Sequence, residues 1–234
     1  MEQLTRTRLL LGDGVDKLRT KTVAVFGLGG VGGHVVEALA RSGIGHLILT
    51  DHDTISITNI NRQILATHST VGMSKVCAAA ARIRDIDPTI KITEMETFYG
   101  PDTAHLFDFE EIDYVVDAID TVTGKLQLIT AAKAASTPII CCMGTGNKLD
   151  PSRLQIADIS KTTVCPLARI MRKECAKRGL KNIKVLYSTE DPLPGGQPDS
   201  EAPDGRRSVP GSVAFVPGAA GLLIAAEVIK DLIK

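Results

Sequence analysis

The sequence predicts an α/β fold in which a doubly wound, mostly parallel Rossmann-like sheet carries an antiparallel C-terminal extension. Short apolar segments alternate with helical segments through the first 150 residues, a pattern typical of parallel sheets with helices on both faces. Hydrophobic residues make up 44% of the chain but aromatic residues only 3%, so we expect an aliphatic core of the kind that fills buried parallel strands. Beyond residue 150 the alternation changes.

The first elements surround a glycine turn. Residues 22–26 form a short apolar run that ends at this turn, so we expect a buried strand there. A helix should follow over about residues 31–42, where a glycine closes it. The next strand, residues 47–50, ends on the acidic residues Asp51 and Asp53.

The same alternation continues to residue 143. We expect a helix at 74–85, stopped by an Asp-Pro pair, then an alternating strand at 90–97 and a short helix at about 102–107. A buried apolar strand at 114–119, an alanine-rich helix at 125–135 and a further strand at 138–143 should follow.

The second half differs from the first, although we expect residues 1–234 to form a single domain. Residues 1–150 would be its nucleotide-binding half, and residues 151–234 an extension. The extension should contain a strand at 154–159, a helix at 166–178, a second strand at 183–187 and a final helix at 219–233. Four prolines and three glycines indicate a mobile loop over residues 191–207.

Composition favours a cytoplasmic protein. The first 17 residues are polar and carry both signs of charge, unlike a signal peptide. The longest apolar stretch, residues 209–229, is interrupted by two prolines and a glutamate, so we expect no stable membrane insertion. The five cysteines form no C-x-x-C pair, which argues against a disulfide framework and a four-cysteine zinc site.

The glycine turn has the spacing of a nucleotide-binding loop. Gly27, Gly29 and Gly32 follow a strand and open a helix, where backbone N–H groups can approach a phosphate. Asp51 ends the second strand, where an acid can bind ribose hydroxyls. These features alone predict NAD at least as well as ATP.

Three further residues favour ATP. Arg62 and Lys75 are two cations near the loop, and they suit a triphosphate better than a pyrophosphate already held by backbone. Asp120 follows the strand at 114–119 and can bind Mg²⁺ together with phosphates. Alternatively, the two cations are ordinary surface charges, Asp120 caps the following helix, and Asn59 only shapes a turn.

Together these motifs resemble the E1-like adenylating superfamily, which activates carboxylates as acyl-adenylates. The resemblance covers nearly the whole chain. It implies that the glycine loop faces the phosphates, that the acids after the second strand reach the ribose and the catalytic centre, and that the cations contact the triphosphate. The residues implied in ATP binding are Gly27, Gly29, Gly30, Gly32, Asp51, Asp53, Asn59, Arg62, Lys75 and Asp120.

The resemblance also implies a catalytic set and a homodimer. Arg6 is similar to a family arginine that reaches into the partner's active site, although from the residues alone it is equally well a surface charge. The catalytic residues would then be Arg62, Lys75, Asp120 as the Mg²⁺ ligand, and Arg6 of the partner.

Within the superfamily, the segments 143–150, 158–167 and 209–217 look like the tRNA threonylcarbamoyladenosine dehydratase branch. Its chemistry would be ATP-dependent cyclisation of threonylcarbamoyladenosine beside the anticodon, through an acyl-adenylate. The extension would face tRNA, and a sulfur-transfer protein is a candidate partner. An alternative is adenylation of the C-terminus of a ubiquitin-like sulfur carrier, although the two C-x-x-C zinc pairs common in those activators are absent.

A basic segment would supply the RNA contact. Arg169, Arg172, Lys173 and Lys177 share one helical face, which suits a row of phosphates as well as it suits a solvated helix. Cys165 is expected to pack at a helix start, or else to be a reactive thiol. Two other functions also remain open, an NAD-dependent oxidoreductase and a non-catalytic nucleotide-binding partner.

Overall fold

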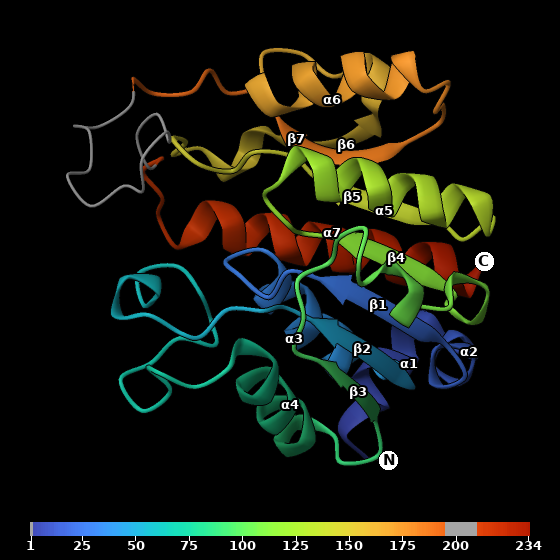
Figure 1. Cartoon of the computed structure of the whole chain (residues 1–234). Coiled ribbons are helices and arrows are strands. Elements are labelled where there is room, and N and C mark those ends of the chain that lie inside the picture. Colours follow the sequence, from blue (N-terminus) through green and yellow to red (C-terminus); the bar gives the residue numbers. More distant parts are fainter. Residues whose placement is uncertain (1, 195–209) are drawn as a thin grey trace.

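The computed structural model describes residues 2–194 and 210–234, and it confirms the predicted α/β class (Figure 1). In this part of the chain the strands form one sheet in the order β3-β2-β1-β4-β5-β7-β6. Their bounds are β1 Thr22–Phe26, β2 His46–Thr50, β3 Lys91–Met95, β4 Tyr114–Asp117, β5 Ile139–Cys142, β6 Leu154–Asp158 and β7 Lys184–Ser188. The β6–β7 pair is antiparallel and the other described pairs are parallel, so the expected antiparallel extension is the β6 edge.

Helices cover both faces of the sheet (Figure 1). One face packs against α2, α3, α4 and α7, and the other against α5 and α6. The bounds are α1 Thr5–Leu11, α2 Gly14–Arg19, α3 Gly32–Ser42, α4 Lys75–Ile86, α5 Val122–Ala134, α6 Pro166–Lys177 and α7 Phe215–Ile233. In the described residues, no helix is both long enough and apolar enough to cross a membrane.

Several boundaries differ from those expected. The last helix begins at Phe215 rather than residue 219, because Pro217 lies in its first turn, where a missing N–H costs no helical hydrogen bond. The helix predicted at 125–135 begins at Val122. The short helix near 102–107 is a 3₁₀ turn, Ala104–Leu106, and the N-terminal segment forms α1 and α2, which the pattern did not predict.

The core is aliphatic on one face only. The layer beneath α3, α4 and α7 is aliphatic, as expected, apart from Tyr114 and Cys142. On the other face, Phe26 packs against Tyr99 and Phe107, with ring centroids 4.9 and 5.0 Å apart. The few aromatic residues are thus concentrated under the end of β1, where they fix the segment that leads from β3 to β4.

The strand order reverses direction between β1 and β4. In open α/β sheets, ligands bind outside the carboxyl ends of the strands at such a point. The loops that follow β1, β2, β4 and β5 all start at this edge, so the topology brings the expected site residues together.

Candidate active site

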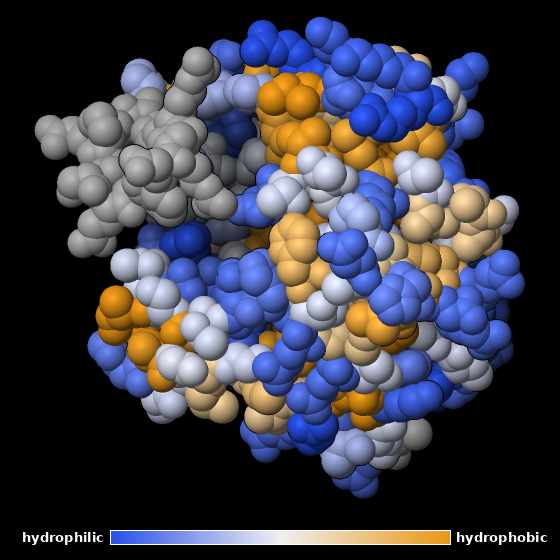
Figure 2. All heavy atoms as spheres, viewed as in Figure 1, coloured by the Kyte–Doolittle hydropathy of each residue, from blue (hydrophilic) through white to orange (hydrophobic). Residues whose placement is uncertain are grey.

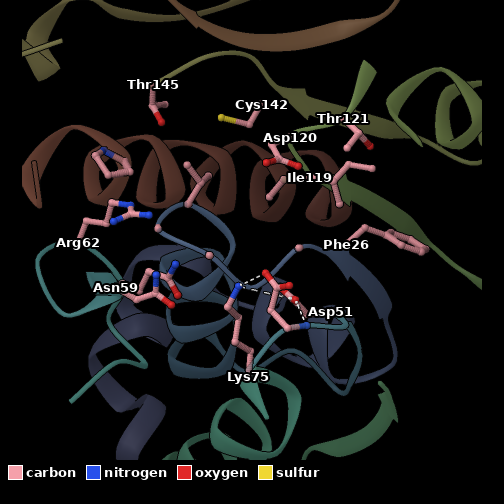
Figure 3. Close-up of a pocket in the computed structure, with 18 of the residues that line it drawn as sticks. Phe26, Asp51, Asn59, Arg62, Lys75, Ile119, Asp120, Thr121, Cys142 and Thr145 are labelled. Carbon is pink, nitrogen blue, oxygen red and sulfur yellow. Dashed lines mark hydrogen bonds and ion pairs between the residues drawn. The ribbon is translucent and has the colours of Figure 1, made fainter. Parts of the chain in front are cut away.

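A cavity of about 910 Å³ lies at this edge of the sheet. We call its two sides the first wall, made by residues 27–31, 50–63 and Lys75, and the second wall, made by residues 118–121 and 142–146. Figure 3 shows Asp51, Asn59, Arg62 and Lys75 along the first wall, and Asp120, Cys142 and Thr145 across from them. Most of the residues predicted to bind ATP therefore line one cavity.

The loop glycines serve different purposes. Gly27 has a φ of +87°, and a Cβ there would lie 2.7 Å from the Ala118 carbonyl oxygen. A Cβ on Gly32 would lie 1.8 Å from the Gly27 oxygen, so this glycine closes the turn although it does not line the cavity. At Gly29 a Cβ would meet only the Gln63 Nε2, at 3.9 Å, so this face of the loop is open to a ligand.

Asp51 fixes the start of the first wall. Its carboxylate accepts hydrogen bonds from the Leu28 N–H at 2.6 Å and from the Asp53 N–H at 2.9 Å. The glycine loop and the end of β2 are therefore joined through one side chain. Asp51 is buried, yet it still faces the cavity.

Lys75 reaches this acid from the first turn of α4, where Ser74 is the N-cap. Its Nζ donates to the Asp53 Oδ2 at 2.6 Å and lies 3.8 Å from the Asp51 Oδ1 (Figure 3). Burial by itself raises the pKa of Asp53, but the Lys75 ammonium lowers it below its ordinary value. Lys75 as a residue is only 5% exposed, and its ammonium is thus held in place before any ligand arrives.

Arg62 and Asn59 come from the loop that follows β2. The Arg62 Nη1 donates to the Thr58 carbonyl oxygen at 3.1 Å and to the Asn61 Oδ1 at 2.9 Å. The Asn59 Oδ1 accepts from the Ser56 N–H at 3.1 Å, so Asn59 shapes the turn as well as lining the cavity.

Asp120 is the charged group of the second wall. It is exposed on the loop after β4, and no hydrogen bond or ion pair to its carboxylate occurs within the described chain. A free carboxylate beside a cavity suits Mg²⁺, which binds hard oxygen ligands and keeps several waters. The residues present fit this ion.

Four buried polar atoms without a hydrogen-bond partner belong to residues that line the cavity. They are Thr50 Oγ1, Gln63 Oε1, Tyr99 OH and Thr121 Oγ1. Burial raises the pKa of Tyr99 to about 12, so its hydroxyl stays protonated. Buried polar groups normally have partners, so unpartnered atoms beside a cavity fit a polar ligand. No role was predicted for these residues, because single Thr and Tyr residues carry no distinctive spacing and Gln63 is only the last residue of the segment that carries Asn59 and Arg62.

The remaining predicted residues lie elsewhere. Arg6 is exposed on α1 and does not line the cavity. Of the basic residues on α6, Arg169 and Lys173 are exposed, whereas the Arg172 Nη1 donates to the carbonyl oxygen and Oγ1 of Thr162 at 2.6 and 2.7 Å. The Lys177 Nζ donates to the Glu174 Oε1 at 2.7 Å.

Cys165 is 2% exposed at the start of α6. It packs with the buried residues of that face. This burial agrees with the packing role rather than with the reactive one.

Comparison with known proteins identifies the family. The model of the ThiF family matches residues 2–234. The chain belongs to the ThiF family. The expected E1-like fold is confirmed, and the match covers both halves of the chain.

Relatives within the family extend this result. A tRNA threonylcarbamoyladenosine dehydratase from Bacillus subtilis (strain 168) is 41% identical over 243 residues, covering 100% of this chain and 96% of the relative. The E. coli tRNA N6-threonylcarbamoyladenosine dehydratase, solved in complex with ATP, is 31% identical with a TM-score of 0.86, covering 97% of this chain and 91% of that one. A molybdopterin-synthase adenylyltransferase from Escherichia coli (strain K12) is 37% identical, but over 55% of this chain and 51% of the relative.

Proposed function

We propose that this protein is an ATP-dependent dehydratase that cyclises threonylcarbamoyladenosine beside the anticodon of tRNA. The observation that carries the proposal is similarity over the full length to a dehydratase of that name, 41% identical, in a chain whose nucleotide-binding residues line one cavity. The similarity to a molybdopterin-synthase adenylyltransferase covers only about half of each chain, 55% and 51%. Adenylation of a sulfur carrier is therefore the second candidate.

In the first step, a carboxylate oxygen of the threonyl group attacks the α-phosphorus of ATP, and pyrophosphate leaves. The product is a mixed anhydride with AMP. Arg62 and Lys75 stabilise the negative charge that develops on the phosphates, while the backbone of Gly29 and Gly30 positions them. Asp51 and Asn59 hold the ribose and the triphosphate in place.

In the second step, the neighbouring carbamoyl group attacks the activated carbonyl carbon. A ring closes, AMP leaves, and the sum of both steps removes one water from the substrate. No enzyme nucleophile is needed, which agrees with the burial of Cys165.

Asp120 would hold Mg²⁺, which supplies charge neutralisation on the departing pyrophosphate. Arg6 would act from the partner subunit of a homodimer, since it does not line the cavity of its own chain. A protein that works on tRNA in this way would be cytoplasmic, and a sulfur-transfer protein stays a candidate partner.

The tRNA would lie across α6. Figure 2 shows hydrophilic side chains along the top of the molecule, where α6 lies in Figure 1. Arg169 and Lys173 are exposed there and can contact phosphates, and Lys177 joins them once its pairing with Glu174 is exchanged for a phosphate. Arg172 would not contact the tRNA directly, because its guanidinium donates to the Thr162 carbonyl oxygen and so holds α6 against the segment before it.

The phosphate contacts are tested by charge reversal. Arg169→Glu with Lys173→Glu should weaken tRNA binding about tenfold or more at low salt and flatten its salt dependence, because fewer counterions are released. Unchanged affinity and salt slope in this variant would show that α6 does not bind the tRNA.

The decisive experiment for the reaction uses purified protein with ATP and tRNA that carries threonylcarbamoyladenosine. We expect AMP, pyrophosphate and a nucleoside lighter by one water, measured by mass spectrometry. A sulfur-carrier protein is the matched alternative substrate. ATP–pyrophosphate exchange with the carrier but not with the tRNA would refute the dehydratase in favour of the second candidate.

A further inference from the structure

A buried charged pair lies behind the second wall of the cavity. The Lys125 Nζ of α5 donates to both carboxylate oxygens of Asp117 on β4, at 3.0 Å each, and to the Cys142 carbonyl oxygen on β5, at 2.7 Å. Both side chains are 0% exposed. The three protons of the ammonium are therefore all used, on the carboxyl ends of two neighbouring strands.

Stability does not explain such a pair by itself. Removing two charges from water is costly, and well-packed apolar side chains often replace a buried ion pair at no loss of stability. The neighbouring inward positions of α5, Leu128 and Ile129, are apolar and equally buried. Burial lowers the pKa of Lys125, but Asp117 raises it above its ordinary value, so the lysine stays charged within this apolar layer.

The contacts of the pair lead directly into the second wall. The Asp117 Oδ1 also accepts from the Ile119 N–H at 3.2 Å, which sets the backbone just before Asp120. The Cys142 carbonyl lies immediately before residues 143–146, which line the cavity as the other part of the second wall. Asp117 pairs in register with Phe26 on one side and Cys141 on the other, at the point where the strand order reverses.

We propose that Lys125 is a positioning residue for the adenylation reaction. It holds the loop that carries Asp120 and the loop after β5 at a fixed separation, from a place that no substrate reaches. This role rests on the proposed function, because it concerns the reactivity of the site and not the integrity of the fold. The side-chain hydrogen bonds of the pair end on the second wall and on the strands behind it, so we expect nucleotide binding on the first wall to change less than the rate.

The test variant combines Lys125→Met with Asp117→Asn. It removes both charges together, so no single charge is left buried, and the asparagine can still accept from the Ile119 N–H. The matched control is Lys184→Met, which removes another lysine that links a strand to a helix. Lys184 donates to Glu227 at 2.7 Å and pairs with Asp231, and neither acid lines the cavity.

We expect a separation of kcat from KM in ATP–pyrophosphate exchange with the modified tRNA. In the double variant kcat should fall at least about tenfold while the KM for ATP changes less than about threefold, because misplacement of a reacting group costs rate more than ground-state binding. Lys184→Met should keep kcat within about twofold of the unaltered chain. A double variant with unchanged kcat, or with kcat/KM lost through KM alone, overturns the proposal.

A second measurement needs no turnover. An Asp120→Cys probe in a Cys77→Ser background reports the surroundings of the loop through its rate of labelling by a thiol reagent. Adding the double variant should change this rate at least about threefold, whereas adding Lys184→Met should not. Equal rates in all three backgrounds refute the positioning role even if the enzyme proves to act on another substrate.

If the double variant does not fold, Lys125→Arg replaces it under the same criteria, because it keeps both charges of the pair and changes only the geometry that joins the two loops. Failure of the unaltered chain to exchange pyrophosphate with either substrate refutes the proposed function, and the labelling rates still decide the role of Lys125.

Discussion

The two walls of the cavity are built in opposite ways. On the first wall, Asp51, Asp53 and Lys75 hydrogen-bond or pair with each other and with the glycine loop. On the second wall, Asp120 is exposed and has no partner in the described chain. Its loop is held from behind by Lys125. The side chains that would bind the nucleotide therefore also hold the fold together, whereas the side chain that would bind the metal does not.

This difference predicts two kinds of response to substitution. A change on the first wall should lower stability and nucleotide binding together, because the same contacts serve both. A change at the surface of the second wall should lower activity alone.

Gly32→Ala should have the largest effect of all. The new Cβ would lie 1.8 Å from the Gly27 oxygen and 2.9 Å from its carbonyl carbon, so the turn cannot keep its shape. We expect a loss of more than about 3 kcal/mol in the free energy of unfolding, measured by chemical denaturation.

Gly29→Ala is the matched control for this turn. Its Cβ would meet only the Gln63 Nε2, at 3.9 Å, and it points toward the cavity. We expect a folded protein whose ATP affinity, measured by calorimetry, is weaker by about tenfold because a methyl group blocks the phosphates. If both alanines were equally well folded, the closure assigned to Gly32 would be wrong.

Lys75→Met should affect stability and function together. It leaves Asp51 and Asp53 without the cation that lies 3.8 and 2.6 Å from them. We expect a loss of about 1–3 kcal/mol in the free energy of unfolding and a fall of more than about 100-fold in pyrophosphate exchange. Lost exchange with full stability would mean that the pairing seen in the first wall contributes nothing to the fold.

The sequence predicted the first wall better than the second. Asp51 follows a recognisable local signal, the end of a strand that comes after a glycine loop, and Arg62 and Lys75 stand out as two cations near that loop. Lys125 gave no signal, because a lysine in an alanine-rich helix looks like a solvent-exposed charge. Its burial depends on Cys142, 17 residues away, and hence on how β5 pairs with β4.

The two other differences between the expected and the observed structure have different causes, one long-range and one local. Phe26 packs against Tyr99 and Phe109, which lie 73 and 83 positions later in the chain, so no local periodicity predicts this aromatic cluster. The earlier start of α7, at Phe215 rather than residue 219, has a local cause, because a proline in the first turn of a helix removes no helical hydrogen bond.

Asp120→Asn should affect function alone. The side chain is exposed and unpartnered in the described residues, so we expect the free energy of unfolding to stay within about 0.5 kcal/mol of its original value. Pyrophosphate exchange should fall about 100-fold, because the variant removes the charge that would hold Mg²⁺. Stability is measured by thermal unfolding, and an equal loss of both properties would remove the distinction between the walls.

The smallest expected effect is a change in how stability depends on pH in acid, and it comes from the Asp53–Lys75 pair of the first wall. The pKa of Asp53 is lower in the folded chain than its ordinary value, since the Lys75 ammonium outweighs the opposing effect of burial. A lowered pKa stabilises the folded state at pH values above the unfolded pKa, near 4, and this stabilisation is lost as the pH falls through the folded value.

The Asp53 side chain is 50% exposed, so solvent screening should keep its contribution below about 1 kcal/mol. Asp53→Asn should flatten the decline in stability between about pH 4 and pH 2 by that amount, measured as the denaturation midpoint across the pH series. Lys75→Met provides the control, because it removes the cation that lowers the pKa of Asp53 and should flatten the same part of the profile. If the decline persisted unchanged in Lys75→Met, the Asp53–Lys75 pair would not be its cause, and the first wall would not stabilise the fold in the way proposed.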